Sequence, residues 1–163
     1  MNKTPSSVCN IRFNDCDMFG HLNNARYIDY MVNARQDHLK EAYNFDLMGY
    51  YKNNLGWVIS QHEITYIKPA FFDEDVLIQS ALLNADADAL YVEVLMMNKN
   101  KTQLKAALRS KLTFINIKTG KRGQHSPEFM EWAKTLLVEE RIYQMGLSER
   151  VKQLLVELKS SHS

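Results

Sequence analysis

Apolar side chains recur at helical spacing in one long stretch of the chain and form strand-like runs in several others. From Asn24 to Tyr43 the apolar positions fall every three or four residues, which predicts a helix of about five turns with one buried stripe. Asn23 or Asn24 could cap this helix, because asparagine is favoured at the N-cap. Five strands are predicted, over residues 8–13, 57–67, 75–85, 90–97 and 104–117. Residues 47–54 are interpreted as a connector that contains turn residues.

The last of these strands alternates most regularly. One of its faces carries apolar side chains: Leu104, Ala106, Leu108, Leu112 and Phe114. The other face carries basic ones: Lys105, Arg109 and Lys111. This alternation is typical of an antiparallel strand with one face in the core and the other in solvent.

Two helices are predicted after the last strand. The first has Pro127 near its start and is expected to run to about Met145, where Gly146 ends it. Ser148 is expected to cap the second helix, whose apolar face comprises Val151, Leu154, Leu155 and Leu158. From Lys159 onward we expect the tail to fray. The sequence does not decide whether these helices cover the sheet or a neighbouring subunit.

Composition excludes several classes of protein. With 163 residues, the chain is long enough for one domain with a full core. A formal net charge of +1 gives no reason to expect binding to nucleic acid or to a membrane surface. No apolar run approaches the roughly 20 residues that a membrane span needs. The first ten residues lack the apolar core of a signal peptide, so we expect a cytoplasmic protein.

The loop over residues 14–22 carries the candidate chemistry. It contains two carboxylates, Asp15 and Asp17, followed by Gly20 and His21, and it leads directly into the predicted helix. The first backbone N–H groups of a helix have no intrahelical partner, so they could stabilise negative charge that develops on a carbonyl oxygen. A carboxylate across from them could attack that carbonyl or activate water.

The run DCDMFGHLNNARYIDYMVNAR, residues 15–35, resembles the hotdog-fold acyl-CoA thioesterases of the 4-hydroxybenzoyl-CoA thioesterase type, which are related to acyl-ACP thioesterases. The matching positions are Phe13, Asp15, Asp17, Gly20, His21, Asn23, Asn24 and Tyr27. The resemblance implies an α+β hotdog fold, in which an antiparallel sheet wraps around a long central helix. The order of elements fits to about residue 117. Residues 1–123 would form the thioesterase domain, and residues 124–163 would be a C-terminal helical extension.

The resemblance also implies catalytic roles. Asp17 matches the carboxylate that acts as nucleophile or general base, although it could instead cap a turn of the loop. The backbone amide of Asn24 would point at the thioester oxygen. His21 could orient water, polarise the carbonyl or simply bind backbone. A thiolate leaving group, with a pKa of about 8.5 by analogy with cysteine, needs little help from a general acid.

Other residues of the motif are candidates for substrate binding. Gly20 would let the substrate approach closely, and Asn23 could contact either the acyl group or the loop backbone. Tyr27 belongs to the motif and is assigned to the same group. Phe19 stands where the acyl-ACP enzymes carry asparagine, and it could narrow the acyl pocket. A second branch of the family has histidine at the position of Asn24. This chain therefore lacks the auxiliary residue of either branch.

The expected substrate is a fatty or aromatic acyl-CoA, with acyl-ACP as an alternative and a non-catalytic acyl-binding or scaffold protein as another. The family pairs subunits and places its sites at their interface, which implies a homodimer or a homotetramer. No metal or redox cofactor is expected. Basic residues after the last strand could meet the phosphates of CoA or be solvated: Lys118, Lys121 and Arg122. Aromatic residues could line an acyl channel or pack in the core: Trp57, Tyr66, Phe71, Phe72 and Phe114.

Overall fold

The computed structural model describes residues 1–161. Its sheet has five antiparallel strands in the order β1-β3-β4-β5-β2. The strands are β1 (Ser6–Asn10), β2 (Leu55–Tyr66), β3 (Asp75–Ala85), β4 (Ala89–Asn98) and β5 (Leu104–Asn116). The helices are α1 (Tyr27–Tyr43), α2 (Leu47–Lys52), α3 (Pro127–Lys134), α4 (Glu140–Gln144) and α5 (Leu147–Ser161). Two short 3-10 turns, η1 (Phe13–Asp15) and η2 (Asn24–Arg26), flank the loop that precedes α1.

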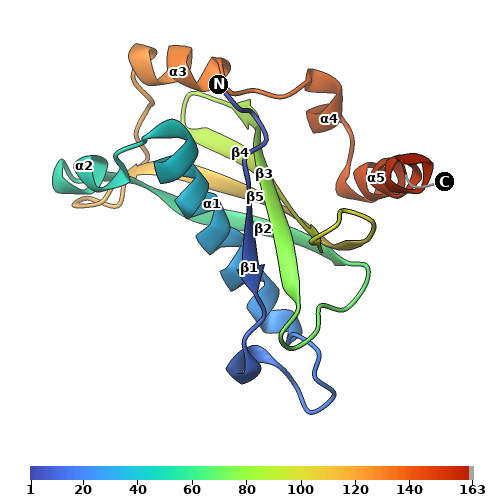
Figure 1. Cartoon of the computed structure of the whole chain (residues 1–163). Coiled ribbons are helices and arrows are strands. Elements are labelled where there is room, and N and C mark those ends of the chain that lie inside the picture. Colours follow the sequence, from blue (N-terminus) through green and yellow to red (C-terminus); the bar gives the residue numbers. More distant parts are fainter. Residues whose placement is uncertain (162–163) are drawn as a thin grey trace.

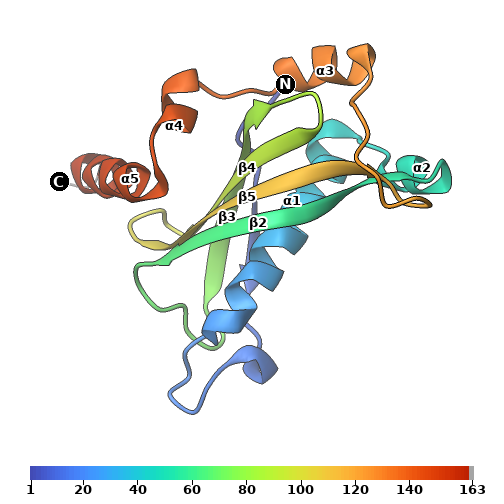
Figure 2. The same cartoon turned by 180° about the vertical axis from the view of Figure 1, so that it is seen from behind.

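The helix α1 packs along one face of the sheet, which curves around it (Figure 1 and Figure 2). Its buried stripe includes Met31 and Ala34, which belong to the same core as sheet residues from three strands: Val76, Ile78, Val94, Met96, Ala106 and Leu108. These residues follow the predicted spacing of the helix and the alternation of the strands. The α+β class and the central helix are therefore as predicted.

The boundaries around the candidate loop differ from the prediction. The first strand covers Ser6–Asn10 and pairs with β3, whereas the predicted range of 8–13 is displaced toward the loop. Phe13 already belongs to a 3-10 turn. The segment expected to open the helix is the 3-10 turn η2, and the side chain of Asn23 makes no capping hydrogen bond there. The predicted asparagine side-chain cap is therefore wrong for Asn23.

The predicted connector at residues 47–54 contains the helix α2. Asp46 caps it, because its Oδ1 accepts a hydrogen bond from the Gly49 amide at 2.9 Å. Tyr50 of α2 stacks on Phe45 with ring centroids 5.4 Å apart. The helix was missed because six residues are too few for a clear helical period.

The strand β5 does not alternate throughout as predicted. Its register against β4 slips between Met96 and Met97, so that Lys105 is the extra residue of a bulge. Leu104 therefore packs in a second cluster with Ala107, on the face opposite α1. Lys105 itself is buried and pairs with Glu74 at 3.1 Å. The prediction that Leu104 shares the α1 face, and that Lys105 faces solvent, is wrong.

The C-terminal segment forms three helices rather than two. The predicted helix over residues 127–145 is interrupted after α3, where the amide of Val138 donates to the carbonyl of Leu82 on β3 at 3.2 Å. The last helix α5 begins at Leu147, one residue before the predicted cap, and continues to Ser161. Fraying from Lys159 is thus wrong for residues 159–161, and residues 162–163 lie outside the described part of the chain.

The helix α5 packs at one end of the sheet face that lies opposite α1 (Figure 2), against Leu95, Met97, Leu104 and Ala107. Val151 and Leu154 are buried there, as predicted, whereas Leu155 is 41% exposed and does not belong to the buried face. A buried ion pair fixes this helix, since Arg150 donates to both carboxylate oxygens of Glu93 on β4. The C-terminal helices therefore pack on their own sheet.

Candidate active site

The loop before α1 is held by the carboxylate that the sequence singles out. Oδ1 of Asp17 accepts hydrogen bonds from the amides of Phe19, at 2.9 Å, and His21, at 3.0 Å. The amide of Asp17 in turn donates to the carbonyl of His21 at 2.8 Å. Both bonds to the carboxylate use Oδ1, so Oδ2 is left for another partner. Asp17 therefore caps the turn and still presents an exposed carboxylate oxygen.

Five of the predicted site residues line one open hollow of about 430 Å³: Asp17, His21, Asn23, Asn24 and Tyr27. Tyr66, at the end of β2, and Lys68 line it from the other side. The structure thus brings together the carboxylate and the helix start that the sequence places ten or fewer residues apart.

Asn24, the first residue of η2, lines this hollow at the start of the helix, and its backbone amide has no hydrogen-bond acceptor in the described part of the chain. The carbonyl of Asn24 accepts a hydrogen bond from the hydroxyl of Tyr66 at 2.8 Å. Tyr66 therefore fixes the peptide that follows Asn24, and it lines the hollow although only a channel or core role was expected for it. Its partner lies 42 positions away, so no local pattern reveals the contact.

His21 and Gly20 shape the loop in different ways. Gly20 has φ +74°, in the left-handed region, and its carbonyl accepts from the amide of Phe72 at 2.8 Å. The ring of His21 meets Phe71 edge-on with centroids 5.1 Å apart. Within residues 1–161, no hydrogen bond engages either ring nitrogen of His21. The imidazole therefore borders the hollow with both nitrogens available to a ligand.

Asp15 has a structural partner. Its Oδ2 accepts a hydrogen bond from the hydroxyl of Tyr30 at 2.6 Å, and burial together with this bond raises the pKa of Tyr30 to about 12. The same hydroxyl accepts from the amide of Arg12 at 3.0 Å. Asp15 thus anchors the loop to α1 through the side chain of Tyr30.

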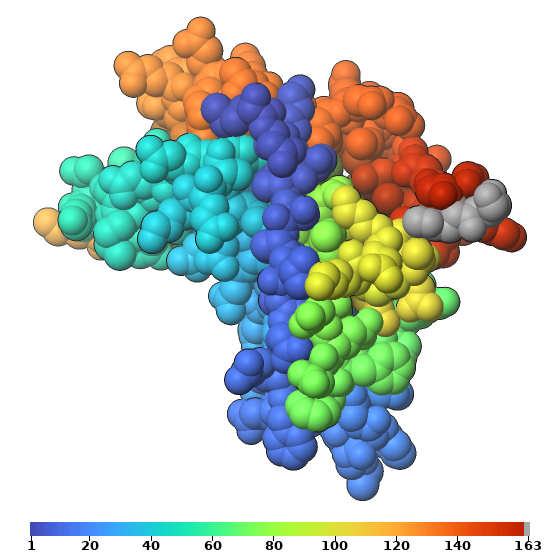
Figure 3. Space-filling model, viewed as in Figure 1, coloured from blue at the N-terminus to red at the C-terminus, as the bar shows by residue number. Residues whose placement is uncertain are grey.

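Tyr27 and Phe19, two further predicted site residues, differ in their exposure. The ring of Tyr27 is buried, and its hydroxyl accepts from the amide of Ala70 at 3.0 Å. Phe19 lies outside the hollow and is 75% exposed. Five exposed apolar side chains, here called the exposed tip, belong to the loop before α1 and to the segment before β3: Phe13, Met18, Phe19, Phe71 and Phe72. Figure 3 shows the loop, in blue, at the lower end of the molecule. It stays a prediction that four residues contact the substrate: Phe19, Gly20, Asn23 and Tyr27.

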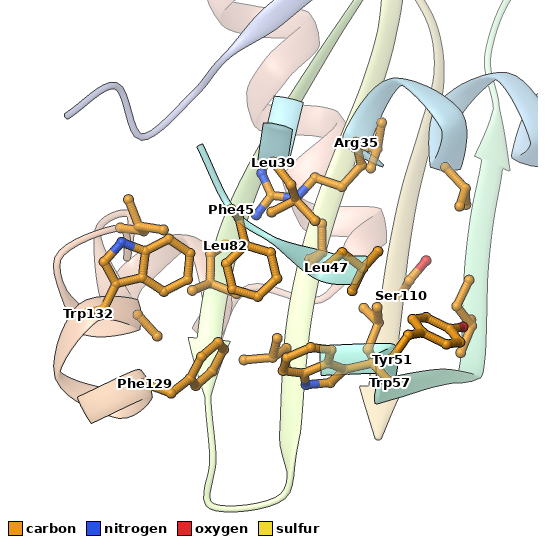
Figure 4. A pocket seen from close by; sticks show the side chains of 18 residues that line it. Arg35, Leu39, Phe45, Leu47, Tyr51, Trp57, Leu82, Ser110, Phe129 and Trp132 are labelled. Carbon is orange, nitrogen blue, oxygen red and sulfur yellow. The ribbon is translucent and has the colours of Figure 1, made fainter. Parts of the chain in front are cut away.

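A separate apolar cavity of about 160 Å³ lies between the sheet and the C-terminal half of α1 (Figure 4). The helices α2 and α3 close it, through side chains such as Leu47 and Phe129. Tyr51 and Ile59, which are 52% and 42% exposed, mark its mouth. Cavities of about 150 Å³ lined by apolar side chains are known to hold a benzene molecule. This cavity is therefore large enough for a short acyl chain or one aromatic ring.

The aromatic and basic candidates separate into two groups. Trp57 lines the cavity and donates through Nε1 to His125 at 2.9 Å. Phe114 packs beside it with ring centroids 4.9 Å apart, whereas Phe71 and Phe72 belong to the exposed tip. Arg122 is exposed and lies 3.8 Å from Asp88, and Lys118 and Lys121 are exposed near the start of β2. These basic residues therefore lie at the opposite end of β2 from Asp17.

Within residues 1–161, no cluster of three or more histidine, cysteine or acidic side chains could hold a metal ion. None of the helices in that range is both long and apolar enough to cross a bilayer.

Comparison with known proteins relates the chain to thioesterases. Residues 11–133 match the family model of the thioesterase-like superfamily. Over 105 residues, the chain is 27% identical to the long-chain acyl-CoA thioesterase FadM of Escherichia coli, covering 64% of this chain and 78% of FadM.

Solved structures of thioesterases share the fold. The DHNA-CoA thioesterase of Staphylococcus aureus superposes with a TM-score of 0.74 and 18% identity, covering 81% of this chain and 90% of that one. For Slr0204 of Synechocystis, a 1,4-dihydroxy-2-naphthoyl-CoA thioesterase, the TM-score is 0.72 and the identity 14%, covering 80% and 96% of the two chains. The probable thioesterase YbaW of Escherichia coli superposes with a TM-score of 0.69 and 24% identity, covering 82% of this chain and 98% of YbaW.

The matched segment contains the candidate loop, the central helix and the whole sheet except β1. The architecture is the hotdog fold of thioesterases, as the sequence motif implied. The chain belongs to the thioesterase-like superfamily.

Proposed function

We propose that the protein hydrolyses acyl-CoA thioesters to the free acid and CoA. One observation carries this proposal: Asp17 and Asn24 line the same hollow, and among residues 1–161 neither Oδ2 of Asp17 nor the amide of Asn24 has a hydrogen-bond partner. A carboxylate and a fixed N–H donor are the two groups that thioester hydrolysis needs, since the thiolate leaves readily. The similarity to FadM, a long-chain acyl-CoA thioesterase, supports CoA as the carrier.

The mechanism follows from these two groups. Asp17 takes a proton from water as the water oxygen attacks the thioester carbon, and the Asn24 amide binds the oxygen that becomes negative. The tetrahedral intermediate then expels the CoA thiolate, which takes up a proton, and the free acid is released. Direct attack by Asp17, which would form an anhydride that water then cleaves, uses the same geometry. His21 borders the hollow and could orient the water.

Wild-type activity tests this proposal against its alternatives. Thiol release would be measured from CoA esters with short, long and aromatic acyl groups, and from the same acyl groups carried on acyl carrier protein. We expect hydrolysis of at least one class of CoA ester. Cleavage of carrier-protein esters alone would favour the acyl-ACP alternative. Binding of acyl-CoA without turnover would favour the acyl-binding alternative. We also propose the cytoplasm as the site of the reaction.

We further propose that the working form is a homodimer, alone or within a tetramer, in which two β2 strands pair antiparallel. β2 is an edge strand of 12 residues, and long unpaired edges are rarely left open. A two-fold axis near His62 would place Tyr66 of one copy opposite Val58 of the other, so that Asp17 of one copy approaches the cavity mouth of the other. The basic residues near the start of β2 would then lie close to the same site.

Light scattering tests the dimer. We expect a mass of twice the 19.0 kDa chain, or four times for a tetramer. Ile59→Lys places a charge on the β2 edge, so we expect a smaller assembly and loss of activity. Lys99→Glu, in the exposed β4–β5 hairpin, changes a charge elsewhere and should leave both unchanged. A fully active wild-type monomer would contradict the dimer while leaving the hydrolysis intact.

A further inference from the structure

The apolar cavity has one charged group in its wall. Among the described residues that line it, Arg35 is the only one with an ionisable charge at neutral pH. The other lining groups are almost entirely aliphatic or aromatic side chains. Figure 4 shows the guanidinium group turned toward Leu39 and Phe45, into the cavity and away from the helix that carries it.

The hydrogen bonds of Arg35 reach only neutral groups. Its Nη1 donates to the Ser80 hydroxyl at 3.0 Å. That hydroxyl lies 2.7 Å from Nδ1 of His38, whose Nε2 lies 2.9 Å from the hydroxyl of Ser7. A guanidinium has five N–H donors, and this network uses one of them. The positive charge of Arg35 is therefore not neutralised by this network of Ser80, His38 and Ser7.

Other cations in the interior of this protein do have carboxylate partners. Lys105 lies 3.1 Å from Glu74, and Arg150 lies 3.0 Å from Glu93. For Arg35, no carboxylate within residues 1–161 lies within 4.0 Å. The ring of Tyr43, 5.7 Å away, offers a cation–π contact but no charge. Burial lowers the pKa of Arg35, and the neighbouring side chain of Tyr43 offsets this only in part.

We propose that the cavity receives an acyl group whose far end carries a second carboxylate, and that Arg35 pairs with it. The inference rests on the proposed thioester hydrolysis and on the proposed dimer, because the cavity and Asp17 lie near opposite ends of β2 within one chain. It assigns the substrate class of that site: monothioesters of dicarboxylic acids. A guanidinium binds a carboxylate through two parallel hydrogen bonds. An alkyl end would leave this half-buried cation against a methyl group. The volume of 160 Å³ fits a chain of about four to eight carbons, by comparison with cavities that hold benzene.

Matched esters test this assignment. Hydrolysis of hexanedioyl-CoA and hexanoyl-CoA, and of the four- and eight-carbon pairs, would be compared by kcat/KM in wild type and Arg35→Met. At the best length, we expect wild type to prefer the dicarboxylic ester by about tenfold or more, the scale of a charge-assisted hydrogen-bond pair. Arg35→Met should abolish that preference. Arg141→Met, at an exposed arginine of α4, is the matched control and should keep it. Equal or faster cleavage of the alkyl esters by wild type would overturn the inference.

A binding measurement separates this inference from the proposed hydrolysis. Hexanoic acid and hexan-1-ol have the same chain, but only the acid offers Arg35 a carboxylate. We expect the acid to raise the melting temperature of wild type more than the alcohol does. Arg35→Lys should retain part of this difference, and Arg35→Met none. If no ester is cleaved but the acid is preferred, hydrolysis fails and the carboxylate site stands. If acid and alcohol act alike, the carboxylate site is wrong whatever the enzyme cleaves.

Discussion

The hydroxyl of Tyr66 donates to the carbonyl of Asn24, 2.8 Å away, and so ties the end of β2 to the start of the central helix. The amide of Asn24 is the proposed oxyanion donor, and its direction depends on the short 3-10 turn that it opens. A donor must be aimed accurately at the developing charge to be effective. Tyr66 holds the peptide that follows Asn24, and we propose that it positions the amide of Asn24 indirectly, by fixing the turn η2.

Tyr66→Phe tests this relationship. Loss of one hydrogen bond of about 1 kcal/mol should lower kcat about fivefold, with little change in KM or in melting temperature. Tyr143→Phe, on α4 and remote from the loop, is the matched control and should behave like wild type. A rise in KM at constant kcat would instead show that the hydroxyl contacts the substrate.

The glycine of the loop can be tested by a pair of substitutions. A Cβ at Gly20 would meet no atom within 4 Å, so the cost of Gly20→Ala comes from its φ of +74°. We expect a loss of about 1–2 kcal/mol in unfolding free energy and a lower kcat, because the loop must change its backbone conformation. Gly146→Ala also meets no atom, and φ is not in the left-handed region there, so it should be neutral or slightly stabilising. Equal effects in urea unfolding would contradict this account.

The buried carboxylate of Glu93 holds the C-terminal helices to the sheet. Arg150 lies 3.0 Å and Arg109 3.5 Å from it, and Arg109 also donates to the carbonyl of Ile142. Glu93→Gln leaves two cations without a counter-charge in the interior and should cost about 3–5 kcal/mol. Glu149→Gln, an exposed neighbour on α5, should stay within about 0.5 kcal/mol. Chemical denaturation of both variants is the measurement, and a small effect of Glu93→Gln would mean that water reaches the pair.

Stability should fall at acidic pH because of His125. Its Nε2 accepts from Nε1 of Trp57, so the neutral ring carries its proton on Nδ1, which donates to the carbonyl of Asp86 at 2.8 Å. Burial lowers the pKa of His125 from 6.5, so near pH 6 the unfolded chain binds more protons than the folded one. The stabilisation that the neutral His125 side chain provides is therefore complete above about pH 6.5. It is lost as the pH falls from there through the lower pKa of His125 in the folded state.

His125→Gln isolates this effect. Glutamine can still accept from Trp57 and donate to Asp86, but it does not titrate. Burial also lowers the pKa values of His38 and His62, and these two residues titrate in both proteins, so their contributions cancel in the comparison. We expect the unfolding free energy of the variant to fall less than that of wild type between about pH 7.5 and about pH 5. Parallel curves would exclude His125 as a source of acid sensitivity.

Local patterns were sufficient for the central part of the fold. The spacing of Met31 and Ala34 predicted the buried stripe of α1, and the range of β3 agrees at both ends. The motif also predicted that Asp17 and the helix start would lie together, because a short loop joins them. These features depend on residues that are close together in the sequence, which is the range that rules for periodicity and capping describe.

The features that were missed depend on distant contacts. The bulge at Lys105 exists because β4 and β5 differ by one residue in register, and alternation along β5 alone does not reveal it. The break after α3 arises where Val138 finds a partner on β3, at Leu82. The lack of a carboxylate near Arg35 can be recognised only when all surrounding strands are in place.

The proposed catalytic role of Asp17 can be tested with three proteins in one assay. Thiol release from the best acyl-CoA ester would be measured for wild type, Asp17→Asn and Asp29→Asn, the last an exposed carboxylate of α1 paired with Arg26. Asparagine keeps an oxygen that can cap the loop, so Asp17→Asn should fold but lose about 100-fold or more in kcat. Asp29→Asn should keep the wild-type rate. If Asp17→Asn cleaves the ester as fast as wild type does, Asp17 only caps the turn and the account is wrong.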